Sequence, residues 1–254
     1  PSLVGSEMCI RDRYIEPPSD LEERAFFAKK VITISYFNKN YLIEKFNIPE
    51  EKIEVIHLGI DLDFFYNGIE KNDKKKIVLS VARLDPVKGL DSLIKACDLL
   101  RRRGIDFQCL IIGEGEERRN LESLIRNLSL GRYVFLLGAK KDEEVREFYR
   151  RSTVFVLPST YETMGVATME AMASRLPVIS TRIYGIPELI DQNINGFLIK
   201  PGDYFSLSVY LEELLKNESK CKEMGDRGRE KIESEFNLKT EVEKLIKVWL
   251  DEKS

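Results

Sequence analysis

The amino-acid sequence predicts an α/β protein built on a doubly wound parallel sheet. Six short apolar runs in the second part of the chain alternate with segments of helical periodicity. These runs are apolar throughout, without alternating polar residues, which indicates strands that are buried on both faces. The chain has 254 residues, of which 43% are hydrophobic, so it can bury a large core. Parallel strands separated by helices require helices on both faces of the sheet.

The composition excludes several classes of protein. The formal net charge is −3, from 40 basic and 43 acidic residues that are well mixed along the chain, which argues against a general nucleic-acid-binding protein. The one histidine and four cysteines lack metal-ligand spacing, so we expect no metal site and no disulfide framework. Free cysteines fit a reducing, cytoplasmic location. No apolar run is long enough to span a bilayer, and peripheral attachment to a membrane surface through parts outside this chain stays open.

The first thirteen residues, PSLVGSEMCIRDR, are not expected to belong to the fold. They do not begin with methionine, show no periodicity and lack the basic start and apolar core of a signal peptide. They resemble the in-frame translation of a transposon-end sequencing adapter. We therefore interpret residues 1–13 as an artefactual tail and expect the rest to be the C-terminal part of a longer protein.

Residues 14–60 have the pattern of the end of an α/β domain. A helix, a strand, a second helix and a second strand are expected at residues 17–30, 31–35, about 36–46 and 53–59. Residues 61–75 lose periodicity and become charged, which indicates an interdomain linker.

Residues 76–236 have the regular alternation of a complete domain. The expected strands are residues 77–82, 107–113, 133–138, 154–158, 177–181 and 196–200. The expected helices are residues 89–104, 118–127, 143–151, 165–174, 204–216 and 221–235. A C-terminal helix follows within residues 237–254.

The alternation fits a Rossmann-like sheet with the strand order 3-2-1-4-5-6. In that order the topological switch lies between the first and fourth strands, and ligands bind beyond the carboxyl ends of the strands at that point. The loop after the first strand is RLDPVKG and the loop after the fourth is STYETMG. Topology alone therefore predicts that these two polar loops form one site.

The first of these loops carries two cations. Arg83 and Lys88 are five positions apart, Pro86 stiffens the loop, and Gly89 leads into a helix. A planar guanidinium and a point-charge ammonium beside a helix N-terminus suit a diphosphate. A solvated loop with incidental charges is the alternative.

The second loop carries a pair of carboxylates. Glu162 lies in the polar turn, and Glu170 lies in GVATMEAMAS, a helix that is small and apolar on nearly every side. An all-round apolar helix is buried, and a buried carboxylate needs a partner or a ligand. With Glu162 at the helix mouth and Glu170 two turns in, a polar ligand at the helix N-terminus could meet both, over about 12 Å of chain. The alternative is a Glu170 that only accepts hydrogen bonds from neighbouring backbone.

Two strings make a family resemblance specific. SVARLDPVKG and PSTYETMGVATMEAMASRLPVIS, with YGIPELI and NGFLIKPGD after them, are similar to the donor-site signature of family 4 retaining glycosyltransferases of the GT-B fold, which has two Glu separated by seven residues. The resemblance implies that Arg83 and Lys88 bind the donor diphosphate and that Glu170 accepts hydrogen bonds from the ribose. It implies that Glu162 contacts the transferred sugar as the catalytic residue. Backbone N–H groups of one turn would touch the sugar or the phosphate: Thr163, Met164, Gly165 and Val166.

Three departures from the family pattern are visible. Ala82 and Arg175 stand where glycine is common, and Thr163 with Met164 replaces a usual Gly-Phe pair, which could change the sugar pocket.

The resemblance implies transfer of a hexosyl group, with retention, from a nucleotide diphosphate sugar to an unidentified glycan, lipid or small molecule. Residues 76–236 would be the nucleotide-sugar-binding domain and residues 14–60 a remnant of the acceptor domain, so the chain alone is expected to bind donor without transferring sugar. No metal and no cofactor beyond this co-substrate is expected. A nucleotide-sugar epimerase of the same fold and a non-catalytic nucleotide-sugar-binding protein stay open.

Overall fold

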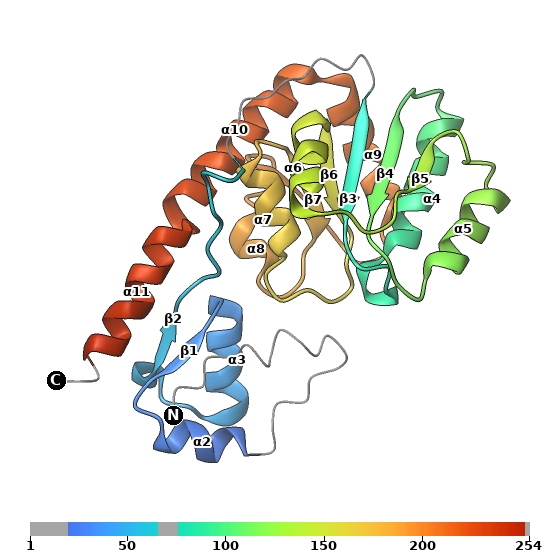
Figure 1. Ribbon diagram of the computed structural model, residues 1–254. Helices are drawn as coiled ribbons and strands as arrows, with labels where there is room; N and C mark the ends of the chain where they lie inside the picture. Colours follow the sequence, from blue (N-terminus) through green and yellow to red (C-terminus); the bar gives the residue numbers. More distant parts are fainter. Residues whose placement is uncertain (1–19, 66–75, 252–254) are drawn as a thin grey trace. The chain divides into compact units, whose positions relative to one another are not determined.

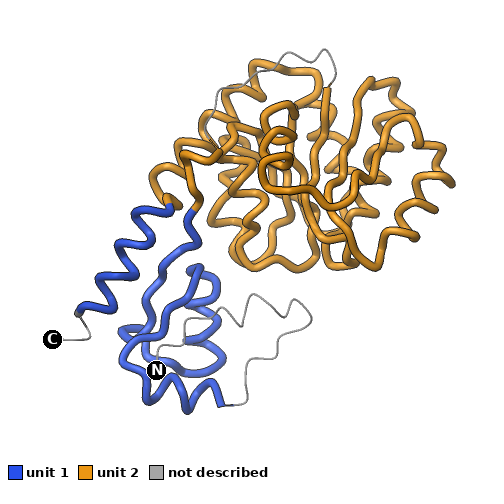
Figure 2. Tube along the Cα trace, viewed as in Figure 1, with its two compact units in different colours: residues 1–59, 238–254 blue, residues 60–237 orange. Residues whose placement is uncertain are grey.

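The computed structural model describes residues 20–65 and 76–251 of the chain. The predicted tail at residues 1–13 and most of the predicted linker lie outside the described residues. The chain divides into two compact units, one of residues 1–59 with 238–254 and one of residues 60–237 (Figure 2). The C-terminal helix is thus grouped with the first unit. The domain boundaries expected from the sequence remain predictions.

The smaller unit contains the expected β-α-β arrangement. Strands β1 and β2 pair in parallel, with Val31 opposite Ile53. Glu241 of the C-terminal helix is buried and accepts hydrogen bonds from the backbone N–H of His57 and from Lys244, which ties this helix to the unit. The elements of this unit are α2 (Leu21–Phe27), β1 (Val31–Thr33), α3 (Tyr36–Phe46), η1 (Glu50–Lys52), β2 (Ile53–Val55) and α11 (Leu238–Asp251).

The larger unit contains a parallel sheet of six strands in its described residues, in the order β5-β4-β3-β6-β7-β8 (Figure 1). Counted from the first strand of this unit, the order is 3-2-1-4-5-6, so the predicted topology is confirmed. The strands are β3 (Ile77–Val81), β4 (Gln108–Ile112), β5 (Val134–Leu136), β6 (Val154–Leu157), β7 (Val178–Thr181) and β8 (Gly196–Ile199).

Helices cover both faces of this sheet. The strands β3, β4 and β5 are added toward one edge of the sheet, and β6, β7 and β8 are added toward the other. Because the crossovers are right-handed, this change places the later helices on the opposite face. The helices α4 and α5 share one face with α9, which packs on α4, whereas α6, α7 and α8 belong to the crossovers of the other. The bounds are α4 (Leu90–Arg102), α5 (Arg118–Asn127), α6 (Asp142–Arg151), α7 (Val166–Ala173), α8 (Ile186–Leu189), α9 (Tyr204–Lys216) and α10 (Glu218–Glu235).

The strand residues divide between two cores. Val78 and Val156 point to the core beneath α4, α5 and α9, and Phe155, which alternates with them, is buried on the side of Tyr149 from α6. The strands β6, β7 and β8 are buried at every residue, which explains their continuous apolar sequence, whereas the edge strand β5 is only partly buried.

Three short elements were not expected. The 3₁₀ helix η1 precedes β2, the 3₁₀ helix η2 (Pro86–Lys88) lies in the loop after β3, and α8 is a single turn after β7. All three are too short to produce a periodic pattern. Among the described residues, no helix is both long and apolar enough to cross a membrane.

Candidate functional site

The loops that follow β3 and β6 pack directly against each other. Their strands are neighbours at the centre of the sheet, with Leu79 opposite Phe155, and both loops leave the same edge. The backbone N–H of Thr160 donates to the carbonyl oxygen of Val87 at 2.7 Å. A Cβ atom at Gly89 would lie 2.2 Å from the carbonyl oxygen of Pro158, so only glycine allows this close approach. The two loops identified from the sequence therefore do meet at the topological switch point.

Local hydrogen bonding fixes the first loop. The Asp85 carboxylate accepts a hydrogen bond from the backbone N–H of Val87 at 3.2 Å and so caps the 3₁₀ turn that Pro86 begins. Gly89 then adopts φ of 62°, in the left-handed region that favours glycine, and starts α4. This conformation sets the direction of Lys88.

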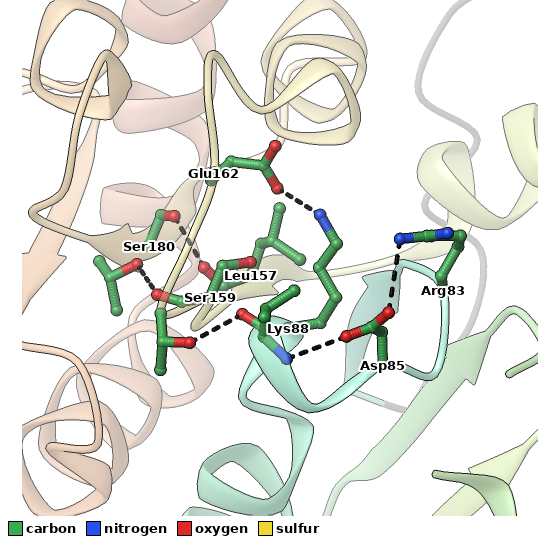
Figure 3. A network of polar contacts seen from close by, with 10 residues as sticks. Arg83, Asp85, Lys88, Leu157, Ser159, Glu162 and Ser180 are labelled. Atoms are coloured by element: carbon green, nitrogen blue, oxygen red, sulfur yellow. Dashed lines mark hydrogen bonds and ion pairs between the residues drawn. The ribbon is translucent and has the colours of Figure 1, made fainter. Parts of the chain in front are cut away.

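Lys88 joins the two loops through an ion pair with Glu162. Its Nζ lies 2.9 Å from Oε2 of Glu162, and the two side chains are 12% and 14% exposed. Arg83 is more open, at 57% exposure, and its guanidinium lies 3.4 Å from the carboxylate of Asp85. Figure 3 shows the Lys88 side chain extending between Glu162 and Arg83. Lys88 thus contacts one of the two predicted carboxylates, whereas Arg83 pairs with Asp85 of its own loop.

Side chains of β7 donate hydrogen bonds to the backbone at the start of the second loop. The hydroxyl of Ser180 donates to the carbonyl oxygen of Leu157, and that of Thr181 donates to the carbonyl oxygen of Ser159 (Figure 3). Oγ of Ser159 and Oγ1 of Thr168 are buried and have no hydrogen-bond partner in the described part of the chain. Unpartnered buried hydroxyls are uncommon and need an explanation.

The turn from Thr163 to Val166 is buried at its two central residues, Met164 and Gly165. The side chain of Met164 is fully buried, so only its backbone can reach a ligand. The carbonyl oxygen of Thr163 accepts a hydrogen bond from the N–H of Gly185 at 3.2 Å. Gly165 has φ of 70°, and a Cβ there would lie 2.7 Å from Cδ1 of Ile186 and 3.6 Å from Cγ of Glu162. A side chain at this position would crowd the turn that carries Glu162.

Glu170 lies closer to the helix start than expected. Because α7 begins at Val166, Glu170 is about one turn into the helix, and the expectation of two turns is wrong. Glu170 is half-buried, and its Oε2 accepts a hydrogen bond from the hydroxyl of Tyr149 at 2.9 Å. The alternative of a carboxylate that binds only neighbouring backbone is therefore wrong as well.

Burial raises the pKa of Glu170, the hydrogen bond from Tyr149 opposes that rise, and the negative charge of Asp142 adds to it. Burial, with the neighbouring Glu170, also raises the pKa of the Tyr149 hydroxyl well above its usual value. The Tyr149 hydroxyl is therefore the hydrogen-bond donor of the pair and the Glu170 carboxylate is the acceptor.

Sequence reasoning missed Tyr149. It lies on α6, 21 residues before Glu170, in a helix with an ordinary amphipathic pattern. A tyrosine in such a helix indicates only a core position, so the sequence held no signal for its contact with α7.

The structure shows the backbone conformation or the burial of residues that depart from the family pattern. Arg175 has φ of 59°, in the region where glycine is favoured, and its guanidinium pairs with Asp226 of α10. Ala82 is not among the residues with positive φ, so a side chain there introduces no backbone strain. The Met164 side chain is fully buried beneath the turn.

Comparison with solved structures gives the class of protein. A variant of TarM from S. aureus, solved in complex with fondaparinux, α-GlcNAc-glycerol and UDP, matches with a TM-score of 0.81 at 26% identity. The match covers 89% of this chain and 45% of that one. The chain therefore has the fold of about half of a GT-B glycosyltransferase.

Sequence comparison then gives the family. Residues 63–231 match the family described as "Glycosyl transferases group 1", and residues 12–64 match "Glycosyltransferase Family 4". This chain belongs to the group 1 glycosyltransferases, within the retaining family 4, as the motifs predicted.

Two curated relatives illustrate the extent of the match. The amylovoran biosynthesis glycosyltransferase AmsK of Erwinia amylovora is 36% identical over 207 residues, which cover 79% of this chain and 51% of AmsK. The uncharacterized glycosyltransferase MJ1178 of Methanocaldococcus jannaschii is 33% identical over 245 residues, which cover 96% of this chain and 65% of MJ1178. The chain thus spans about half to two thirds of the length of these curated relatives.

Proposed function

We propose that this chain is the donor-binding part of a retaining glycosyltransferase that transfers a hexosyl group from a nucleotide diphosphate sugar. The observation that carries the proposal is the ion pair between Lys88 and Glu162, which brings a cation and a carboxylate from two loops together at the switch point. A donor of this class presents an anionic diphosphate next to an uncharged sugar. The pair offers one group to each.

Arg83 and Lys88 bind the diphosphate in this proposal. The exposed guanidinium of Arg83 offers a planar fork, and the ammonium of Lys88 is a point charge fixed by the capped turn. As the bond between the sugar and the diphosphate breaks, negative charge develops on the leaving phosphate, and these cations stabilise it without a metal ion.

Glu162 is the catalytic residue of the proposal because it touches the transferred sugar. When the diphosphate takes Lys88, the carboxylate of Glu162 accepts hydrogen bonds from sugar hydroxyls. Backbone N–H groups between Thr163 and Val166 face the sugar or phosphate at the start of α7, where the helix dipole favours negative charge. The hydroxyls of Ser159 and Thr168, which lack partners among the described residues, support a polar ligand here.

Glu170 binds the ribose. Its half-buried carboxylate sits one turn inside an otherwise apolar helix, and such a charge suits the hydroxyl pair of a nucleoside. The acceptor is a hydroxyl compound from the glycan, lipid or small-molecule classes. Its oxygen forms the new bond to the anomeric carbon on the face that the diphosphate leaves, and its proton is released.

The test is calorimetric titration of the chain with UDP, GDP and ADP. UDP is included because the similar TarM structure contains it. The double variant Arg83→Ala with Lys88→Ala should weaken binding of the preferred nucleotide by about a hundredfold or more, since each of the two charged hydrogen bonds contributes roughly 1.5–3 kcal/mol.

A charge-matched control is Arg126→Ala with Lys216→Ala. Both residues lie in the last turns of helices that run back to the opposite edge of the sheet, so this variant should bind like the parent chain. Equal affinity of the parent chain and the Arg83 and Lys88 variant would refute the diphosphate assignment.

A further inference from the structure

Tyr149 is a buried tyrosine whose hydroxyl is directed at the candidate site. The side chain is fully buried, and its ring lies edge-on to Phe65 at 6.1 Å and tilted against Phe155 at 5.8 Å, between ring centroids. Aromatic contacts on these sides fix the ring in one orientation. The phenolic oxygen therefore has little freedom to choose its partners.

The hydroxyl has two acceptors and one proton. It lies 2.9 Å from Oε2 of Glu170 and 3.2 Å from the carbonyl oxygen of Ala167. A charge-assisted hydrogen bond is shorter and stronger than a neutral one, so the proton goes to the carboxylate while Glu170 is ionised. Both acceptors lie on α7, so the Tyr149 hydroxyl fixes the position of the Glu170 carboxylate relative to the backbone of that helix.

The bond occupies only one oxygen of the carboxylate. Within the described residues, no hydrogen bond involves Oε1 of Glu170, and Oε2 is held by Tyr149. A carboxylate fixed through one oxygen on a rigid ring presents the other oxygen in a defined direction. Fixing a ligand-binding group in advance lowers the entropy lost on binding.

We propose that Tyr149 is a positioning residue that orients the carboxylate of Glu170 toward the ribose of the donor and so sets the discrimination for ribose. This inference rests on the proposed role of Glu170. The tendency of Tyr149 to keep the buried carboxylate ionised agrees with it, because an ionised carboxylate is the stronger acceptor. A purely structural hydroxyl would instead link α6 to α7 without affecting which nucleotide binds.

The experiment measures the ratio of affinities for UDP and 2′,3′-dideoxy-UDP, the analogue without ribose hydroxyls. It uses the full chain and the variants Tyr149→Phe, Glu170→Gln and Tyr133→Phe. Tyr149→Phe removes one oxygen and keeps the ring, so the fold should persist. Tyr133 is a partly buried tyrosine packed on Phe107 in the other core, so it serves as the matched control.

The parent chain should prefer UDP by about tenfold or more, and Glu170→Gln should remove most of that preference. Tyr149→Phe should reduce the ratio by about threefold to tenfold, and Tyr133→Phe should leave it unchanged. In the Glu170→Gln background, Tyr149→Phe should have no further effect on the ratio, because it acts through that carboxylate.

The outcomes separate the two proposals. An unchanged ratio in Glu170→Gln would overturn the ribose assignment of the proposed function. A reduced ratio in Glu170→Gln with an unchanged ratio in Tyr149→Phe would overturn only the role of Tyr149. Equal weakening of both nucleotides by Tyr149→Phe, together with a lower melting temperature, would also overturn it and leave a structural hydroxyl.

Discussion

Lys88 and Glu162 form an ion pair in which each charge depends on the other. Both side chains are nearly removed from water, so the loss of one partner would leave an uncompensated charge, at a cost of up to about 3–5 kcal/mol. In the proposed complex the donor supplies replacement partners, a phosphate for Lys88 and sugar hydroxyls for Glu162. Without a ligand, the ion pair therefore holds two functional groups of opposite charge in place. When the donor binds, both groups become available to contact it.

Glu170→Gln is expected to weaken nucleotide binding about tenfold or more, because a charged hydrogen bond to the ribose contributes roughly 1.5–3 kcal/mol. The fold should be kept. Burial raises the pKa of Glu170, so ionisation destabilises the folded state as the pH rises from about 4.3 through that raised pKa. At pH 7 the neutral amide should therefore leave the free energy of unfolding unchanged or higher, and the difference should vanish in acid.

Thermal unfolding without ligand and titration with UDP measure the two effects separately. Glu223→Gln, an exposed position on α10, is the control and should change neither. A lower melting temperature of Glu170→Gln with unchanged affinity would show that Glu170 supports the fold and does not bind the ribose.

The residues of the candidate site differ in how far the sequence could reveal them. Arg83, Lys88, Glu162 and Glu170 lie on two motifs whose spacing is visible in the sequence, and the structure brings Lys88 into contact with Glu162. Tyr149 reaches Glu170 only because α6 and α7 cover the same face of the sheet. A contact of that kind depends on how two helices pack, and no local pattern encodes it.

The elements were predictable where the pattern was long. Continuous apolar strands and regular alternation determine the sheet order, because right-handed crossovers leave few arrangements. The single turn α8 and the 3₁₀ turn η2 depend instead on capping and on contacts between loops, such as Asp85 with the N–H of Val87. The depth of Glu170 in α7 was misjudged for the same reason, since the helix begins only after the left-handed Gly165.

The packing of α10 on α7 depends on Gly225. A Cβ there would lie 2.0 Å from the carbonyl oxygen of Arg175, in the turn that ends α7. Gly225→Ala should therefore destabilise the protein by about 1–3 kcal/mol despite the better helix propensity of alanine, because the helix must move away from this turn. Denaturant unfolding measures the change.

Gly228, in the same helix, is the matched control. A Cβ there would meet Met172 at 3.6 Å, which is ordinary contact distance. Gly228→Ala should be neutral or stabilising by up to about 1 kcal/mol. Equal stability of the two variants would mean that the close approach at Gly225 does not hold α10 against α7.

At the scale of the whole molecule, the first and last residues of the larger unit lie next to each other. Ile60 and Asn237, at the limits of the larger unit, form a parallel β-bridge, and the N–H of Ile60 donates to the carbonyl oxygen of Phe236 at 2.9 Å. The two ends of the larger unit are thus hydrogen-bonded to each other. This unit also contains every residue that we propose to bind the donor. Donor binding should accordingly be a property of this unit.

Sugar transfer, in contrast, is expected to require more than this chain. An enzyme of the GT-B fold assembles its site from a donor domain and an acceptor domain, and this chain spans 51% of AmsK. The purified chain should therefore bind UDP but release no UDP from UDP-glucose or UDP-N-acetylglucosamine above the rate in buffer, with or without simple glycoside acceptors. Release of UDP and the anomeric signals of any product can be followed together by NMR. Turnover that disappears in Lys88→Ala would contradict this expectation, because it would place a complete transferase site within these 254 residues.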